Sequence, residues 1–270
     1  MARLTLILLT GLCLGWVAPV AAAPADASVT KADVVIDPGH GGTNTGSPGR
    51  GELLEKQATL AISKAVAREL RAAGLVVTLT RTHDEYVPLR ARARLANALS
   101  PQCFVSIHTN ASPDHSRHGI ETYLLSRDAI DIHARLAAQL AADDGAAIVA
   151  EQHVFSTARA SLQLAQTVQK HLLGGTSTLN GSSYFPSDRG VRQASHDVLA
   201  DAEVPAILVE AGFLDHPVEG RVLASAVGQA ATAHLIASGI LAFVRQRQAQ
   251  QVALAAPEGP VVVARALTPR

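Results

Sequence analysis

Short apolar runs alternate along this chain with longer segments in which apolar residues recur at helical spacing. The run 34–36 ends in Asp37, Pro38 and glycines, and a predicted helix over 55–73 follows it. Further strands are predicted at 75–80, 104–108, 119–125 and 206–209, and further helices at 89–99, 129–142, 158–173 and 218–245. Strands and helices in alternation favour a parallel sheet covered on both sides. We therefore expect an α/β fold: a single three-layer domain with a mostly parallel, twisted sheet and helices on both faces.

Two stretches depart from this pattern. Residues 150–155 are typical of an irregular connection between two Ala-rich helices. Residues 174–183 are rich in Gly, Ser and Thr and indicate a loop, which leads through 189–191 to a short predicted strand near 198–199.

The N-terminus has the features of a signal peptide. Arg3 supplies a positive start, residues 4–20 are apolar, and small residues follow at 21–25. A retained transmembrane anchor is the alternative, but glycines and a proline interrupt the apolar stretch. We expect residues 1–25 to be a cleaved signal peptide, no retained membrane span, and a periplasmic or secreted protein.

The rest of the chain divides into a domain and a tail. Residues 30–245 hold every predicted element, whereas 246–270 are rich in Gln, Ala and Pro and have little to bury. We therefore expect a catalytic domain over 30–245 and a disordered tail over 246–270. Cys103 is the single cysteine after the signal segment, which excludes an internal disulfide and favours a buried core residue.

Composition argues against a nucleic-acid partner. Lys and Arg together number 23, as do Asp and Glu, and aromatic residues make up 3%. A chain of zero formal charge has no general attraction to phosphates or to an anionic membrane, and few aromatic rings are available for base stacking.

Two histidines and two carboxylates stand where predicted elements begin or end. His40, His108 and Glu210 each come at the carboxyl end of an apolar run, and Glu55 comes at the start of a predicted helix. The carboxyl ends of parallel strands share one edge of a sheet, where α/β proteins place their chemistry. The four residues can therefore meet in one cleft, which suggests a metal hydrolase.

Zinc fits this set of side chains. A catalytic zinc site keeps three protein ligands from imidazole nitrogen and carboxylate oxygen and leaves a fourth position for water. His40, Glu55 and His108 supply such a set for one Zn²⁺, and Glu210 would carry the proton from water to the leaving amine. Taken alone, each histidine is more often structural, and Glu55 could be an ordinary helix-start carboxylate with Glu52 as its competitor.

Other polar residues have two interpretations. His115 and His118 are spaced for a second metal site, but the surrounding Pro and Gly favour histidines in a solvated loop. Arg81, Asp84 and Arg90 could orient a substrate, although we favour a role in holding a loop and a helix start together.

Several segments in a fixed order carry a resemblance to a known family. They are 34–42, 55–56, 79–81, 106–111, 119–123, 189–191 and 208–213. Together they resemble the zinc-dependent N-acetylmuramoyl-L-alanine amidases, and an ordered set is far more specific than any single motif. The resemblance implies His40, Glu55 and His108 as zinc ligands and Glu210 as the catalytic carboxylate.

The resemblance also implies a substrate and a reaction. The family hydrolyses the amide between N-acetylmuramic acid and the first L-alanine of the peptidoglycan stem peptide. Peptidoglycan is then the partner, in a compartment that an exported protein reaches. A zinc peptidase or carboxypeptidase acting on peptidoglycan peptides is one alternative, and a non-catalytic wall-binding regulator is the other, although the four site positions are filled.

Two parts of the chain differ from the family pattern. His196 and Asp197 stand just before the predicted strand near 198–199, where relatives usually carry apolar or aromatic residues. The substrate contacts on this side are therefore expected to differ from those of the relatives. Some relatives carry an inserted helix over the zinc in the region that corresponds to 126–160. An activator protein acting on this segment is therefore a hypothesis, with Glu151 as a residue that could reach the metal, but its Ala-rich composition favours a plain packing helix.

Overall fold

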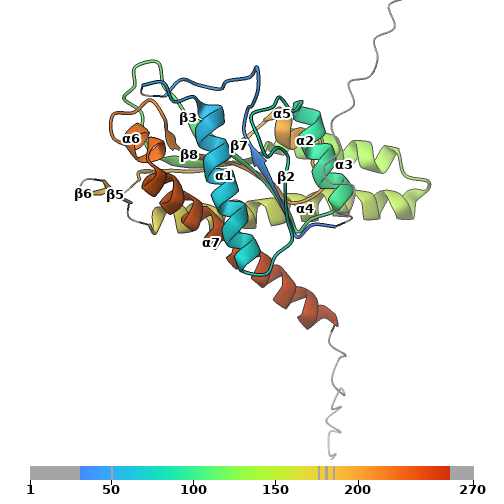
Figure 1. Cartoon of the computed structure of the whole chain (residues 1–270). Helices are drawn as coiled ribbons and strands as arrows, with labels where there is room; N and C mark the ends of the chain where they lie inside the picture. The colour runs from blue at the N-terminus through green and yellow to red at the C-terminus, as the bar shows by residue number, and fades with distance from the viewer. Residues whose placement is uncertain (1–30, 50, 176, 180–181, 185, 256–270) are drawn as a thin grey trace, which may run out of the picture.

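Six strands form one mixed sheet in the computed structural model, which describes residues 31–49, 51–175, 177–179, 182–184 and 186–255 (Figure 1). Their order across the sheet is β2-β1-β3-β8-β4-β7. The strands are β1 (Val34–Pro38), β2 (Val77–Leu79), β3 (Cys103–Asn110), β4 (Ile120–Leu125), β7 (Asp188–Ala194) and β8 (Ala206–Phe213). A separate antiparallel pair is formed by β5 (Ser177–Leu179) and β6 (Ser182–Tyr184).

Helices cover both faces of this sheet, which confirms the predicted three-layer α/β domain. On one face lie α1 (Glu55–Ala72), α4 (Asp144–Leu173) and α7 (Ala226–Ala255), and on the other α2 (Leu89–Leu99) and α5 (Asp197–Ala200). The remaining helices are α3 (Arg127–Gln139), which packs on α4, and α6 (Glu219–Ala224), which lies between β8 and α7.

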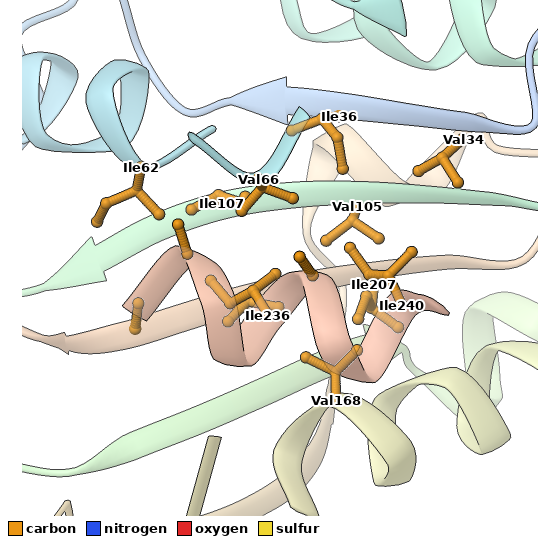
Figure 2. Packing of buried hydrophobic residues seen from close by; sticks show 14 of the residues in the cluster. Val34, Ile36, Ile62, Val66, Val105, Ile107, Val168, Ile207, Ile236 and Ile240 are labelled. Carbon is orange, nitrogen blue, oxygen red and sulfur yellow. The ribbon is translucent and has the colours of Figure 1, made fainter. Parts of the chain in front are cut away.

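The alternation of side chains along β1 explains the two cores. Val34 and Ile36 join the larger core with α1, α4 and α7, whereas Val35 joins the smaller core with α2 and α5. Figure 2 shows the larger core, where Ile236 of α7 lies close to the strands beside Val66 of α1. Apolar burial on both faces is what a largely parallel sheet requires.

The strands β4 and β7 run opposite to the other four. β1, β2, β3 and β8 pair in parallel, but β4 pairs antiparallel with β8 and parallel with β7. The connection 111–119 contains no helix, and a parallel return needs a crossover of a dozen or more residues. As a result Glu121, near the start of β4, lies directly opposite Glu210 on β8.

Several local predictions were wrong. Residues 150–155 lie inside α4, which starts where the Asp143 side chain accepts a hydrogen bond from the Ala146 backbone N–H at 2.8 Å. The segment 188–194 is an edge strand, β7, and 198–199 lie in the short helix α5 instead of a strand. Edge strands and single helical turns carry weak periodic signals, because tertiary contacts decide them.

The predicted closing helix is two helices with a break at Ser225, and the second continues to Ala255. The expected disordered tail therefore begins inside a helix, and its part beyond 255 lies outside the described residues, as does the predicted signal peptide. By length and composition α7 could cross a membrane, with a mean hydropathy of 1.5 in its most apolar window. Half of that window is buried in the protein, as in the core helix of a globular domain.

A buried ion pair joins the sheet to α2. Arg92 Nη1 lies 2.8 Å from Asp37 Oδ1, and the two side chains are 2% and 0% exposed. Arg92 also donates to the backbone oxygens of Pro38 and His40 at 2.7 and 2.6 Å. Ser106, in the middle of β3, donates to Asp37 Oδ2 at 2.6 Å, so the end of β1, the middle of β3 and the helix α2 are tied together.

Breaking this pair should destabilise the protein strongly. We expect Arg92→Leu to lower the free energy of unfolding by about 3–5 kcal/mol, because it leaves the Asp37 charge buried without its partner. Arg94→Leu, on the exposed side of the same helix, is the matched control and should change stability by no more than about 0.5 kcal/mol. Urea denaturation followed by circular dichroism measures both, and equal losses in the two variants would contradict the role of the pair.

Candidate metal centre and active site

Three of the predicted site residues converge on one point. His40 Nε2 and His108 Nδ1 each lie 3.0 Å from Glu55 Oε1. One potential ligand atom from each residue falls within 4.8 Å of the others, and this is the one such group of three found among the described residues. Glu55, which is 3% exposed, is the buried member, while both imidazoles are partly accessible. The exposed competitor Glu52 is not part of the group.

The chemistry of this group suits a divalent metal ion. Two imidazole nitrogens and one carboxylate oxygen are a common zinc donor set. Ligands about 2.0–2.1 Å from a tetrahedral ion lie roughly 3.3 Å from one another, close to the observed nitrogen–oxygen separations of 3.0 Å. The two nitrogen–oxygen separations therefore fit a shared ion, and the three ligand atoms all lie within 4.8 Å of one another.

His40 sits on a tightly constrained loop after β1. Its φ angle is 60°, in the left-handed region that non-glycine residues seldom adopt. Arg92 holds its carbonyl oxygen, and Gly39 before it lies against the other imidazole: a Cβ at Gly39 would come within 2.5 Å of His108 Cε1. Glycine is thus needed where the loop passes the ring of His108.

Asn44 determines which nitrogen of His40 faces the site. Asn44 Oδ1 is 2.9 Å from His40 Nδ1 and also accepts from the Gly46 backbone N–H at 3.3 Å. Because the amide oxygen accepts from Nδ1, the imidazole directs Nε2 toward Glu55. Asn44 was not among the residues expected in the site, although its short distance from His40 in the chain was an available signal.

Glu55 is oriented by backbone donors. Its Oε1 accepts from the Thr109 N–H at 3.1 Å and its Oε2 from the Ser47 N–H at 2.9 Å. Burial alone would raise the pKa of Glu55, but hydrogen bonds from His108 and His40 outweigh it and lower the pKa well below its usual range. The same contacts raise the pKa of His40, although burial opposes that change. Glu55 is therefore held as a carboxylate.

Glu210 lies beside this group with the opposite character. It pairs in register with His108 across β3 and β8. Burial is the main cause that raises its pKa well above the usual range, and the charges of Glu55 and Glu121 add to it. Its Oε2 is buried and has no hydrogen-bond partner within the described part of the chain. The pKa values of Glu55 and Glu210 are thus shifted in opposite directions, although the two carboxylates are neighbours.

Glu121 is the acidic neighbour that the sequence analysis missed. It is 2% exposed and accepts hydrogen bonds from Asn110 Nδ2 at 2.7 Å and from Arg189 Nε at 3.2 Å. The sequence does hold a signal for Glu121: it is a carboxylate in a predicted strand, on the other face from the apolar residues Ile120 and Leu124. Without the antiparallel pairing of β4 and β8, its position beside Glu210 could not be inferred.

Arg81 and Asp84 hold the His40 loop to the start of α1. Arg81 is 1% exposed, and its Nη2 donates to the Gly39 and Lys56 carbonyl oxygens at 2.7 and 2.9 Å. Asp84 accepts from the Gly42 N–H at 2.8 Å and from Lys56 Nζ at 2.7 Å. Arg90 is exposed, 3.6 Å from Asp201. The structure thus supports the loop-holding role for Arg81 and Asp84.

The other histidines stand apart from the three-residue group. His115 Nδ1 lies 2.8 Å from Asp215, and His118 Nδ1 lies 3.0 Å from Ser187 Oγ, so the two rings have different partners. His196 makes an edge contact with Tyr123, with ring centroids 4.7 Å apart. His196 therefore packs beside the strand that carries Glu121.

The segment 126–160 lies at the other end of the sheet. It forms α3 and the first half of α4, a hairpin that projects past the sheet in Figure 1. Ser161 Oγ of α4 accepts from the N–H of Ala206, at the amino end of β8, whereas Glu210 is near the carboxyl end. The proposed reach of Glu151 to the metal is therefore wrong for this structure.

Comparison with known proteins identifies the family. A sequence model described as N-acetylmuramoyl-L-alanine amidase matches residues 34–242. N-acetylmuramoyl-L-alanine amidase AmiA of Escherichia coli (strain K12) is 32% identical over 220 residues, which cover 79% of this chain and 76% of AmiA. AmiC of Neisseria meningitidis serogroup B is 31% identical over 221 residues, 78% of this chain and 52% of AmiC.

Solved structures agree with the sequence comparison. N-acetylmuramoyl-L-alanine amidase AmiC2 of Nostoc punctiforme aligns with a TM-score of 0.62 at 32% identity, covering 78% of this chain and 96% of that one. The amidase of Clostridium difficile 630 aligns with a TM-score of 0.62 at 30% identity, covering 81% and 99%. The family resemblance seen in the motifs is thereby confirmed: this chain belongs to the N-acetylmuramoyl-L-alanine amidases.

Proposed function

We propose that this protein is a zinc-dependent amidase that hydrolyses the bond between N-acetylmuramic acid and the L-alanine of the peptidoglycan stem peptide. The single observation that supports zinc dependence is the convergence of His40, Glu55 and His108. Family membership supplies the amidase activity, and the positions of the side chains support the proposed residue roles.

His40, Glu55 and His108 would hold the ion. When bound, zinc would supply Lewis-acid polarisation of the scissile carbonyl and activation of water. The protein residues prepare the site: Asn44 directs Nε2 of His40 inward, and the Thr109 and Ser47 amides orient the Glu55 carboxylate. Partners that orient the ligands in this way are a usual requirement of metal sites.

Glu210 would be the proton carrier of the reaction. A general acid–base is most effective when its pKa lies near the working pH, and burial raises the pKa of Glu210 toward that region. It takes a proton from the attacking water and returns it to the leaving amine of L-alanine. Its buried, unpaired Oε2 has no structural hydrogen bond within the described residues that this transfer would break.

The substrate implies an exported protein. Peptidoglycan lies outside the cytoplasmic membrane, and the signal-like segment 1–25 supports export to the periplasm or beyond. An activator acting on 126–160 stays a prediction. Because that hairpin lies at the amino end of β8, such a partner would act from the end of the sheet away from the candidate metal centre.

Removing the Glu210 carboxylate tests the assignment of the proton carrier. We expect Glu210→Ala to retain zinc and to lose roughly 10²–10⁴-fold in kcat, the usual contribution of a general acid–base. Glu203→Ala, an exposed carboxylate just before β8, is the control and should keep full turnover. Metal analysis and digestion of purified peptidoglycan provide the measurements.

The products of this digestion separate the candidate activities. Free stem peptides identify amidase cleavage, trimmed peptides would indicate a peptidase, and no products would indicate a binding protein. Normal turnover by Glu210→Ala would contradict the proposed mechanism.

Gly46 packs directly against two of the three proposed ligands, Glu55 and His40. A Cβ at Gly46 would lie 2.6 Å from Glu55 Oε2 and 2.7 Å from His40 Cδ2, so Gly46→Ala should displace both side chains. We expect zinc affinity to fall about 10–100-fold, as when a supporting contact of a metal site is lost. Competition with a chromophoric chelator measures this affinity.

Gly51→Ala is the matched control for the backbone effect. Gly51 also has a positive φ, 74° against 67° for Gly46, but a Cβ there would meet nothing within 4 Å. Both variants incur the strain of a left-handed conformation, about 1–2 kcal/mol. Only Gly46→Ala should weaken zinc binding, and equal affinities in the two variants would exclude these three residues as the ligands.

A further inference from the structure

Two arginines on the edge strand β7 meet one buried carboxylate. Arg189 Nε and Arg192 Nε both lie 3.2 Å from Glu121 Oε2. The other oxygen of Glu121 accepts from Asn110 at 2.7 Å. Glu121 thus accepts hydrogen bonds from Asn110 and Arg189, while the Nε–H of Arg192 donates to the Arg189 carbonyl oxygen at 3.0 Å and Arg192 contributes to Glu121 as an ion pair. Glu121 balances one of the two guanidinium charges.

An irregularity in β7 brings these arginines together. Residues three apart in a regular strand point to opposite faces. Here the register with β4 shifts between Ile120 and Glu121, so that Arg189 is the extra residue of a bulge, and Gly190 has a φ of 88°. Bulges of this kind re-aim side chains and recur next to active sites.

The outer nitrogens of both guanidinium groups remain available. Within the part of the chain that the structure describes, no acceptor is hydrogen-bonded to an Nη atom of Arg189 or Arg192. Their side chains are 24% and 48% exposed, and a Cβ placed on Gly190 between them would meet nothing within 4 Å. The guanidinium of Arg189 is further supported by the ring of Phe213, 5.1 Å from its centroid.

The strand that carries this pair lies two strands away from Glu210. Glu121 lies opposite Glu210 on the neighbouring strand, and Gly190 lies opposite Glu121 on the next one. Two strand spacings of about 4.8 Å place the arginine strand roughly 10 Å from the strand of Glu210. A residue next to the cleaved L-alanine can bridge that gap, because a peptide extends by about 3.3–3.6 Å per residue and arginine adds its own reach.

We propose that Arg189 and Arg192 form a subsite that binds a free carboxylate of the stem peptide, on the residue that follows L-alanine. This inference rests on the proposed function. The planar fork of guanidinium matches a carboxylate in shape and charge. The Nε of Arg189 is bound by Glu121 and the Nε of Arg192 by the Arg189 carbonyl oxygen, which leaves the Nη atoms of both arginines for a ligand. A carboxamide at the same place lacks the charge, and its NH₂ group meets a guanidinium N–H where a carboxylate would offer a second acceptor oxygen. The subsite therefore selects an acidic stem peptide over an amidated one.

The test compares two muropeptide fragments with the zinc-loaded protein. One fragment carries a free α-carboxylate on the residue after L-alanine, and the other carries the carboxamide. We expect the wild-type protein to show the lower KM with the acidic fragment. Arg192→Gln should raise this KM about tenfold, the size of one lost charge-assisted hydrogen bond, with kcat changed less than twofold. The KM for the amidated fragment should not change.

Two further variants separate recognition from a structural role. Arg192→Lys keeps the charge but not the fork and should retain part of the preference for the acidic fragment. Arg135→Gln removes the same charge from the hairpin helix α3 and should leave both KM values unchanged. Equal KM values of the wild-type protein for both fragments, or an equal rise for both fragments in Arg192→Gln, would overturn the proposal.

Binding of the product measures the subsite without turnover. Calorimetric titration of the wild-type protein with the acidic free stem peptide should give at least tenfold tighter binding than its amidated form, and Arg192→Gln should remove the difference. Equal affinities in the wild-type protein overturn the subsite. Peptide binding with this preference, but without release of stem peptide from either fragment, would overturn the proposed function and leave the subsite supported.

Discussion

The buried pair of Asp37 and Arg92 connects the fold to the chemistry. Arg92 comes from α2, yet it binds the Asp37 carboxylate and the carbonyl oxygens of Pro38 and His40, which lie at the end of β1. An ion pair removed from water is costly unless its remaining hydrogen-bonding groups are also satisfied, and here they are bound by β3 and by the loop. The left-handed conformation of His40 is held by this network, since an isolated loop would not keep it.

The two carboxylates of the site, Glu55 and Glu210, differ in their hydrogen-bond donors and therefore in the direction of their pKa shifts. Glu55 receives two backbone N–H groups and two imidazoles, and its pKa is lowered despite burial. Glu210 receives none of these donors, and burial raises its pKa. One carboxylate is thereby prepared to remain charged beside a cation and the other to exchange a proton. Glu121, the third carboxylate of this region, forms ion pairs with the two arginines of β7.

Much of this arrangement could be predicted from the sequence. The apolar runs and helical stripes predicted the sheet and most helices, and the position of His40, Glu55, His108 and Glu210 at element ends predicted their convergence. The errors fall where local signals are weak. The helix start at Asp144 depends on a single cap, and β7 is an edge strand with exposed, polar residues. For the segment 126–160 the sequence favoured a plain packing helix and left a cover over the metal as a hypothesis, because sequence alone does not show the direction of β4.

The sequence by itself determined the layered α/β architecture and the set of side chains for the site, because burial periodicity and residue chemistry are local properties. Only the tertiary structure decided the antiparallel direction of β4, the neighbourhood of Glu210 and Glu121, and the bulge that joins Arg189 to Arg192. These features arise from pairing between strands far apart in the chain. Strand direction and register follow from packing and connection length across the whole sheet, which no short segment encodes.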